Sequence, residues 1–223
     1  MCGRYTLQAT PEELAKQFNA VIEDMSLFKP RYNIAPSQSV AVVRLKSDAS
    51  HRELVQLRWG LIPSWAKDPK IAYSTINAKA ETVAEKPAFR SAFRKRRCLI
   101  PASGFYEWQK EGKQKQPMYI RLRDRRPFAF AGLWEHWEPK EGEPLESCTI
   151  VTTDANEFMV PIHNRMPVIL ASQDYDRWLD PTVPPDSLQA FLKPYAVNEM
   201  EAYAVSKMVN NPRNDILQCV EPI

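Results

Sequence analysis

The chain has 223 residues, of which 44% are hydrophobic and 26% charged, and its formal net charge is +3. This is an ordinary globular composition, and the length suits one large domain with a substantial buried core. No stretch approaches the roughly 20 apolar residues of a membrane span, and no apolar signal segment follows the start of the chain. We therefore expect a cytoplasmic protein without a membrane partner, in which only a local basic patch would bind a polyanion.

Proline is abundant, with 19 residues, and separates many short apolar runs, whereas glycine is scarce, with 6. A first helix is predicted behind Thr10, with Pro11 at its first position and Glu13 completing a capping box. Alternating or β-branched runs predict strands over 39–45, 54–63, 97–101, 117–123, 128–134 and 148–153. Further helices are predicted over 86–97, 172–179 and 185–192. These elements indicate an α+β fold, a single β-rich domain over 1–223 with peripheral helices.

The cysteines and histidines do not form a metal-binding pattern. No two cysteines are spaced as C-x-x-C, and the histidines do not cluster with them: the residues are Cys2, Cys98, Cys148, Cys219, His51, His136 and His163. We predict neither a metal site nor a disulfide framework, and no cofactor.

The chain begins "MCGRY", which places a cysteine directly behind the initiator methionine. Aminopeptidases remove Met1 when the next side chain is small, and Cys2 would then carry an α-amine beside its thiol. With reference pKa values of about 7.7–8.0 and 8.5, both groups are partly nucleophilic near neutrality. An aldehyde would form a Schiff base with the amine, and the thiol would then close a five-membered thiazolidine. The alternative is that a residue at this position has no function.

Two segments carry polar residues that suit such chemistry. In "STINAKAET", Asn77 and Glu81 would share one face of a helix, and Asn77, Lys79 and Glu81 one face of a strand. A polar surface turn is the simpler interpretation of that segment. In "FYEW", Glu107 stands among three aromatic residues, which would raise its pKa and suit proton transfer. The alternative is an amphipathic strand that leads into a hairpin and turns Glu107 outward.

A third segment, "PIHNRMP", contains His163 with Arg165 beside it. A lone histidine is more often structural than catalytic. This segment is a poor strand and a poor helix, so we expect a loop to hold His163, and loops often carry functional residues.

Basic and aromatic residues alternate in "KPAFRSAFRKRR". On a helix, Phe89 and Phe93 would form an apolar stripe facing the core, and Arg90 and Arg94, with Arg97 one turn on, a basic stripe. The basic side would either meet phosphates or be an ordinary solvated face.

The segment "RWGLIPSWAKDPK" adds two tryptophans near cations. Trp59 continues a strand-like alternation and is expected to be buried. Trp65 lies beside Lys67 and Lys70, and an exposed tryptophan there would suit stacking on unpaired bases.

Together these segments resemble the SRAP (SOS response-associated peptidase) family. The resemblance covers nearly the whole chain and is carried, in family order, by "MCGRY", "RYNIAPSQ" (31–38), "RWGLIPSWA" (58–66), "INAKAET" (76–82), "CLIPASGFYEW" (98–108) and "IHNRMPVIL" (162–170). It implies a barrel-like core of mixed and antiparallel strands. It also implies a sensor that shields abasic sites in single-stranded DNA, whose ring-opened sugar presents an aldehyde.

The resemblance assigns roles to the residues singled out above. Cys2 would be the nucleophile that forms the thiazolidine, and Asn77 would orient Cys2 or the sugar. Glu107 would move protons during Schiff-base formation and ring closure, and His163 would act as acid and base on the sugar oxygen. Arg4 would meet a phosphate and Trp65 would stack on a base. The residues predicted to bind DNA are Arg4, Trp65, Lys79, Arg90, Arg94 and Arg165.

One departure from the family pattern concerns phosphate binding. The family commonly has Asn-Ala-Arg where this chain has Asn77-Ala78-Lys79, and lysine lacks the bidentate fork of arginine. The contact would be weaker or would shift to Arg90 or Arg94.

Two other functions stay open from the residues. One is a thiol peptidase that uses Cys2 on other proteins, which is the activity in the family name. The other is a single-strand binder without catalysis. Peptidase activity limited to exposing Cys2, a weak lyase activity and a monomeric state complete the expectations.

Overall fold

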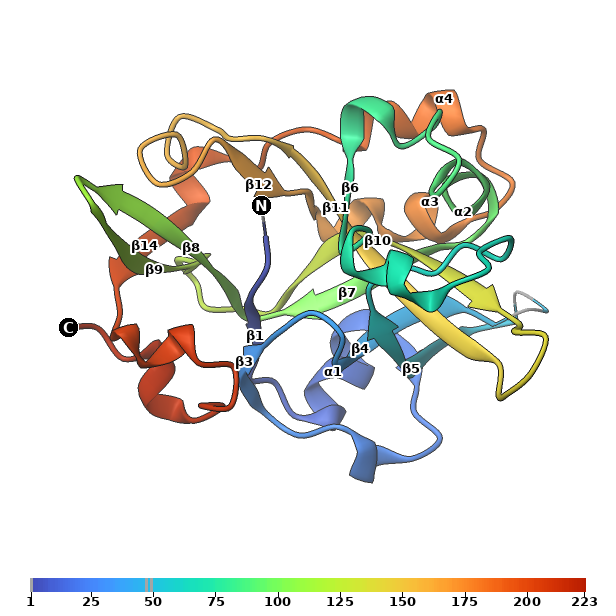
Figure 1. Ribbon diagram of the computed structural model, residues 1–223, viewed down its shortest axis with the longest axis horizontal. Coiled ribbons are helices and arrows are strands. Elements are labelled where there is room, and N and C mark those ends of the chain that lie inside the picture. The colour runs from blue at the N-terminus through green and yellow to red at the C-terminus, as the bar shows by residue number, and fades with distance from the viewer. Residues whose placement is uncertain (1, 47, 49) are drawn as a thin grey trace.

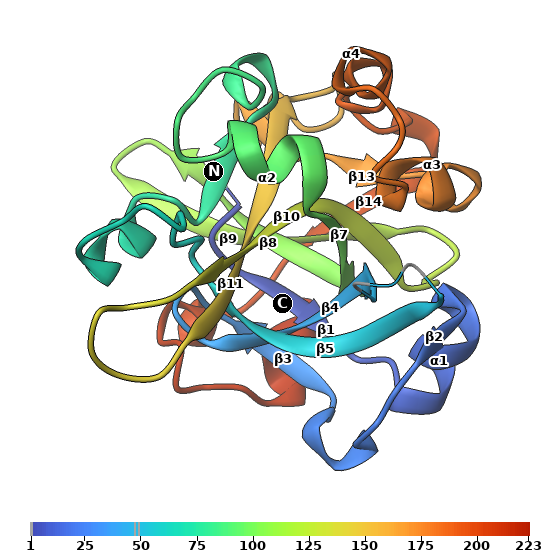
Figure 2. The same ribbon diagram turned by 90° about the vertical axis from the view of Figure 1, so that its right-hand side faces the viewer.

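The computed structural model describes residues 2–46, 48 and 50–223 (Figure 1). Strands form the body of this α+β structure, and the short helices lie outside them in both views (Figure 1 and Figure 2). The helices are α1 (Pro11–Phe18), α2 (Arg90–Lys95), α3 (Tyr175–Leu179) and α4 (Pro185–Leu188). A 3-10 turn over Ser172–Asp174 leads into α3, and another over Gln189–Phe191 follows α4.

Five strands close into a barrel. They are β4 (Ser39–Leu45), β5 (Arg52–Trp59), β7 (Arg97–Ala102), β10 (Phe128–Trp137) and β11 (Leu145–Asp154). They pair in the order β11-β10-β7-β4-β5, and β5 then pairs in parallel with β11 through Arg58 with Ser147 and Trp59 with Cys148. Closure leaves these strands without a free edge. The barrel-like core that the resemblance implied is thereby confirmed.

Four short strands extend the barrel sheet. β2 (Ala20–Val21) pairs with β5, and β13 (Ile169–Leu170) pairs with β10. β11 receives β6 (Asn77–Lys79) in parallel and β12 (Arg165–Pro167) in antiparallel orientation. Two predicted site segments, those of Asn77 and His163, are therefore brought to the same strand.

The second sheet has the order β14-β9-β8-β1-β3. Its strands are β1 (Tyr5–Leu7), β3 (Arg31–Ile34), β8 (Gly104–Glu111), β9 (Gln114–Leu122) and β14 (Met200–Ala204). β8 and β9 form the predicted hairpin, and Gly112 in its turn has φ +59°. β1 is an internal strand, bonded to β3 on one side and β8 on the other, so the start of the chain is part of the sheet.

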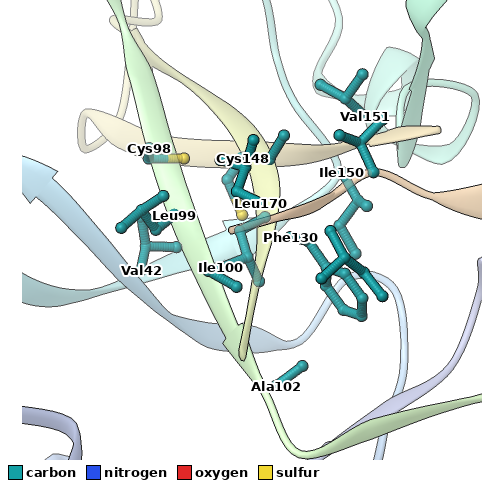
Figure 3. Close-up of a cluster of buried hydrophobic side chains, with 14 of the residues drawn as sticks. Val42, Cys98, Leu99, Ile100, Ala102, Phe130, Cys148, Ile150, Val151 and Leu170 are labelled. Atoms are coloured by element: carbon teal, nitrogen blue, oxygen red, sulfur yellow. The ribbon is translucent and has the colours of Figure 1, made fainter. Parts of the chain in front are cut away.

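The barrel is filled by aliphatic, aromatic and cysteine side chains. In Figure 3, Val42 of β4, Leu99 of β7, Phe130 of β10 and Ile150 of β11 belong to this cluster, and all four are buried. Cys98 and Cys148 are buried in the same cluster as free thiols, so they serve as small apolar side chains. Cys2 and Cys219 are likewise buried free thiols.

The helices begin and end where local chemistry dictates. Thr10 accepts from the backbone of Glu13, and the Glu13 carboxylate accepts from the backbone of Thr10 at 2.8 Å, which is the predicted capping box. Asn19 ends α1 in the left-handed conformation, with φ 48°. In the part of the chain that the structure describes, no helix is long and apolar enough to cross a membrane.

The predicted basic helix is shorter than its charge pattern suggested. Phe89 and Phe93 are buried as predicted, but Arg97 is not part of an exposed stripe. Arg97 is 3% exposed at the start of β7, and its guanidinium donates to backbone carbonyls of Trp178, Phe93, Arg94 and Asp180. It ties α2 to α3, because buried guanidinium donors need acceptors.

Gly104 of β8 lets the ring of Tyr119 on β9 pack directly against the β8 backbone. A Cβ at this position would overlap the ring of Tyr119, coming within 2.7 Å of its Cε2 atom. Tyr119 cannot withdraw easily, since its hydroxyl is bonded to Thr6 at 2.8 Å and to Gln8 at 3.1 Å.

We predict that Gly104→Ala lowers the free energy of unfolding by about 1–3 kcal/mol, the usual cost of overpacking. Urea denaturation measures the change. Combining it with Tyr119→Ala removes the overlap, so the two costs should not add. Unchanged stability of Gly104→Ala would contradict the contact.

Candidate active site

Cys2 lies at the entry to β1 and is completely buried. The sheet holds the residues that follow it: the backbone N–H of Tyr106 donates to the carbonyl of Arg4 at 2.9 Å, and Tyr5 pairs with Phe105. Cys2 belongs to the hydrophobic core cluster that also contains Phe105. The predicted nucleophile is therefore fixed in place by the fold.

Asn77 contacts Cys2 directly. Its Nδ2 donates to the carbonyl oxygen of Cys2 at 2.9 Å, and the side chain is 9% exposed. β6 places it there by pairing Asn77 with Ile150, while the Trp59 indole N–H donates to the carbonyl of Ile76 at 2.9 Å. The surface-turn interpretation is wrong for Asn77, because pairing with β11 makes β6 a strand in which Asn77 and Ala78 are buried and Lys79 is exposed.

Glu107 lies on the side of β8 that faces the core. In a strand, residues two apart share a face, so Glu107 follows Phe105, whose ring packs 6.0 Å from that of Phe130. Glu107 is 3% exposed. The segment is a strand that leads into a hairpin, as one interpretation had it, but the carboxyl points inward rather than outward.

Burial governs the electrostatics of Glu107 and Cys2. Desolvation raises the pKa of the Glu107 carboxyl above its ordinary value of 4.5, and the nearby charge of His163 opposes this shift. Burial also raises the pKa of the Cys2 thiol, and the charge of Glu107 adds to that shift. Glu107 therefore lies close enough to both Cys2 and His163 to interact with each of them electrostatically.

His163 is held by a loop, as predicted. Its backbone N–H donates to the carbonyl of Met159 at 2.9 Å. The side-chain oxygen of Asn156 accepts from the backbone N–H of Met159, also at 2.9 Å. On the far side, the backbone N–H of Arg165 donates to Nδ1 of His163 at 3.0 Å. The loop is thus a compact turn that presents the imidazole.

The residues predicted to bind DNA fall into two groups. Trp65 is 59% exposed, and Lys79, Arg90 and Arg94 are exposed on β6 and α2, whereas Trp59 is buried as expected. The indole N–H of Trp65 donates to the carbonyl of Pro87 at 3.3 Å, which ties it to the segment before α2. These four side chains are available to a ligand.

Arg4 and Arg165 are engaged within the protein. Arg4 Nη1 donates to Asn33 Oδ1 at 2.8 Å and to the carbonyl of Val209 at 2.7 Å. The Arg165 guanidinium bonds the carboxylates of Glu81 and Asp154. Their DNA contacts remain predictions.

Three residues near the site were not predicted from the sequence. Asn33 links Arg4 to the C-terminal segment, and Glu81 and Asp154 hold Arg165. Glu81 had a signal, because it lies four residues after Asn77, but its partner is 84 residues away. Across the described ranges, no group of three or more His, Cys, Asp or Glu side chains is placed to hold a metal ion.

Two features of the structure characterise the class of protein to which the chain belongs. They are the closed five-stranded barrel and the buried cysteine just before β1. The profile of the SOS response associated peptidase (SRAP) family matches residues 1–212. The chain therefore belongs to this family, which confirms the resemblance noted in its sequence.

Named relatives and a solved structure agree with this placement. The chain is 48% identical over 227 residues to the abasic site processing protein YoqW of Bacillus subtilis, covering 99% of both chains. It is 34% identical to the abasic site processing protein HMCES of Xenopus tropicalis, covering all of this chain and 78% of that protein. A crystal structure of a protein from Bacteroides thetaiotaomicron matches with a TM-score of 0.91 and 29% identity over the full length of both chains.

We predict that Glu107→Gln stabilises the protein increasingly as the pH rises above about 4.5. Because the folded state raises the pKa of Glu107, it binds more protons than the unfolded state in the window above the ordinary pKa. The wild-type free energy of unfolding therefore falls through that window by about 1.4 kcal/mol for each unit of pKa shift. Glutamine does not titrate and avoids this loss.

Urea denaturation at several pH values measures the difference between the two proteins. The exposed Glu157 provides the control, since Glu157→Gln removes the same charge from the surface. A difference between Glu107→Gln and wild type that does not change with pH would contradict the prediction.

Proposed function

We propose that this chain captures abasic sites in single-stranded DNA covalently, through Cys2 after removal of Met1. The observation that carries the proposal is that four residues from distant segments, Cys2, Asn77, Glu107 and His163, lie together. Asn77 bonds the Cys2 carbonyl, and Glu107 interacts electrostatically with both Cys2 and His163. The relatives YoqW and HMCES are named as abasic site processing proteins, which supports the same substrate here.

The proposed reaction uses both nucleophiles of the N-terminal residue. The α-amine of Cys2 attacks the aldehyde carbon of the ring-opened sugar, and the resulting carbinolamine loses water to give a Schiff base. The thiol sulfur then adds to the imine carbon, its proton passes to the nitrogen, and a thiazolidine results. The net change is one aldehyde joined to one aminothiol with loss of one water.

The site residues supply the proton transfers. A carboxyl whose pKa is raised by burial keeps its proton at higher pH, so Glu107 can donate to the departing hydroxyl of the carbinolamine. As a carboxylate it can then accept the thiol proton. His163 acts as acid and base on the sugar oxygen during ring opening and during reversal of the crosslink. Asn77 fixes the Cys2 peptide so that the amine and thiol stay beside Glu107.

The raised pKa of the Cys2 thiol bears on the choice of nucleophile. Nucleophilic cysteines of thiol peptidases have a lowered pKa and react as thiolates, whereas burial raises the pKa of Cys2. This favours attack by the amine before the thiol and weighs against turnover of other proteins. We limit the proposed peptidase activity to the processing that exposes Cys2. The Schiff-base stage permits strand cleavage, so a weak lyase activity is part of the proposal.

DNA would reach the site over the exposed cations and the exposed indole. Lys79 directly follows the buried part of β6, two residues from Asn77. Arg90 and Arg94 lie on one side of α2, and Trp65 is tied to the segment before that helix. Phosphate contacts by the cations and base stacking by Trp65 would hold a single strand across Cys2.

We predict that the wild-type protein gives a heat-stable adduct with single-stranded DNA that bears one abasic site. Cys2→Ala and Cys2→Ser keep an α-amine but lose the thiol, so each should form only a Schiff base that borohydride traps. Denaturing electrophoresis with and without borohydride measures both species. The intact mass of each protein establishes whether Met1 has been removed. A heat-stable adduct in equal yield from Cys2→Ala would exclude the thiazolidine.

We also predict that Lys79 makes one phosphate contact. For single-stranded DNA, Lys79→Ala should reduce the slope of log Kobs against log salt by about 0.7, the value for one neutralised phosphate. Lys16 is the control because it lies on α1. This helix follows the end of β1 that is farther from Cys2 (Figure 1). Titrations at several salt concentrations measure the slopes. Equal slopes for Lys79→Ala and wild type would remove Lys79 from the DNA surface.

A further inference from the structure

Asn156 lies at the start of the loop that carries His163 and is buried, with 8% of the residue exposed. Its side-chain oxygen accepts from the backbone N–H of Met159 at 2.9 Å, and its backbone carbonyl accepts from the same N–H at 3.0 Å. The carbonyl of Met159 in turn accepts from the backbone N–H of His163 at 2.9 Å. The Asn156 amide therefore caps the turn that leads to His163.

The nitrogen of the same amide bonds a different part of the chain. Nδ2 of Asn156 donates to the carbonyl of Tyr195 at 2.7 Å and to Sδ of Met200 at 3.3 Å. The Met159 N–H can only donate and the Tyr195 carbonyl can only accept, so the amide has one orientation in which both bonds form. Both polar atoms of the Asn156 side chain are thereby bonded, as buried polar atoms ordinarily are.

Tyr195 and Met200 belong to the segment that leads into the second sheet. Met200 begins β14, which pairs with β9, and β9 pairs with β8, the strand of Glu107. The bonds of Asn156 therefore connect the loop of His163, through two strand pairings, to the strand that carries Glu107.

A second hydrogen bond joins the same loop to β8 directly. Gln109 lies two residues after Glu107 on β8, and its Nε2 atom donates to the carbonyl of Pro161 at 3.1 Å. Residues two apart share one face of a strand, so Gln109 and Glu107 lie on the same side of β8. Pro161 is two residues before His163. We call the side chains of Asn156 and Gln109 the loop tethers.

We propose that Asn156 and Gln109 are positioning residues, and that the loop tethers fix the His163 imidazole relative to Glu107. Amides do not titrate near neutrality, so neither side chain supplies a proton. Their role is to restrict the movement of the loop, because acid–base catalysis needs the donor within hydrogen-bond reach of its target. The inference rests on the function proposed above and deepens it, since it names what holds the acid–base residue of that reaction in place.

The decisive variant is Asn156→Ser. The hydroxyl keeps an oxygen that accepts from the Met159 N–H, but it is too short to reach the Tyr195 carbonyl. Asn198→Ser is the matched control, because it makes the same change between Tyr195 and Met200. The Asn198 side chain is exposed and makes no hydrogen bond or ion pair among the residues that the structure describes.

Gln109→Ala is the second variant. It changes a half-buried side chain at the edge of the loop and should fold even if Asn156→Ser does not. Thermal unfolding verifies the fold of each variant, and all rates are compared below the transition of the least stable one.

A double-mutant cycle with His163→Gln tests the proposal through the rate of adduct formation at saturating abasic-site DNA. Asn156→Ser should lower the rate about tenfold and Gln109→Ala about threefold, within the roughly 10²–10⁴-fold that acid–base catalysis supplies. In the His163→Gln background each should change the rate by less than about twofold, because the residue through which it acts is gone. Unchanged rates, or an equal decrease in both backgrounds, would overturn the proposal.

Binding of undamaged single-stranded DNA separates positioning from DNA recognition. The affinity should not change in Asn156→Ser or Gln109→Ala if the loop tethers act only through His163. A loss of affinity as large as the loss of rate would show that they shape the DNA-binding surface instead, and would overturn the proposal.

Imidazole ¹⁵N and ¹H NMR spectra test the loop tethers without DNA. The His163 signals, assigned by their loss in His163→Gln, should shift in Asn156→Ser and Gln109→Ala and stay in place in Asn198→Ser. Unchanged His163 signals in the first two variants would overturn the positioning role. A wild-type protein that forms no adduct would instead overturn the proposed function, while the spectra still report on the loop tethers.

Discussion

The pairing of β1 between β3 and β8 is the constraint on which the site depends. A chain end is ordinarily mobile, and a mobile Cys2 could not keep its amine and thiol beside fixed proton donors. Here the strand after Cys2 is hydrogen-bonded on both sides, and Asn77 holds the Cys2 carbonyl at 2.9 Å. The stability of the two sheets is thereby used to orient a terminal residue.

Burial acts in the same direction on the two titratable groups of the site, Glu107 and Cys2. It raises the pKa of the Glu107 carboxyl, which makes it a proton donor at higher pH, and it raises the pKa of the Cys2 thiol, which keeps the sulfur protonated. A site built this way is poorly suited to a thiolate attack and well suited to an amine that reacts first. The proposed order of bond formation follows from this arrangement of desolvated groups.

The barrel and the site are connected through β11. This strand closes the barrel with β5 and also receives β6 and β12, which carry or directly adjoin the segments of Asn77 and His163. Hydrogen bonds from the Arg165 side chain to Glu81 and Asp154 join those two segments a second time. Strands of the barrel sheet thus supply the framework that brings the segments of Asn77 and His163 together.

The sequence by itself determined six of the longer strands, the capped first helix, the family and the candidate site residues Cys2, Asn77, Glu107 and His163. Strand 39–45 and the Thr10 cap were predictable because alternation and capping are local in the chain. Only the tertiary structure decided that Asn77 is buried, that Glu107 points inward and that Arg97 is internal. It likewise revealed the pairing of Arg165 with Glu81, 84 residues apart. Which face of a strand is covered, and which charge meets which, depends on segments distant in sequence, so local patterns do not contain that information.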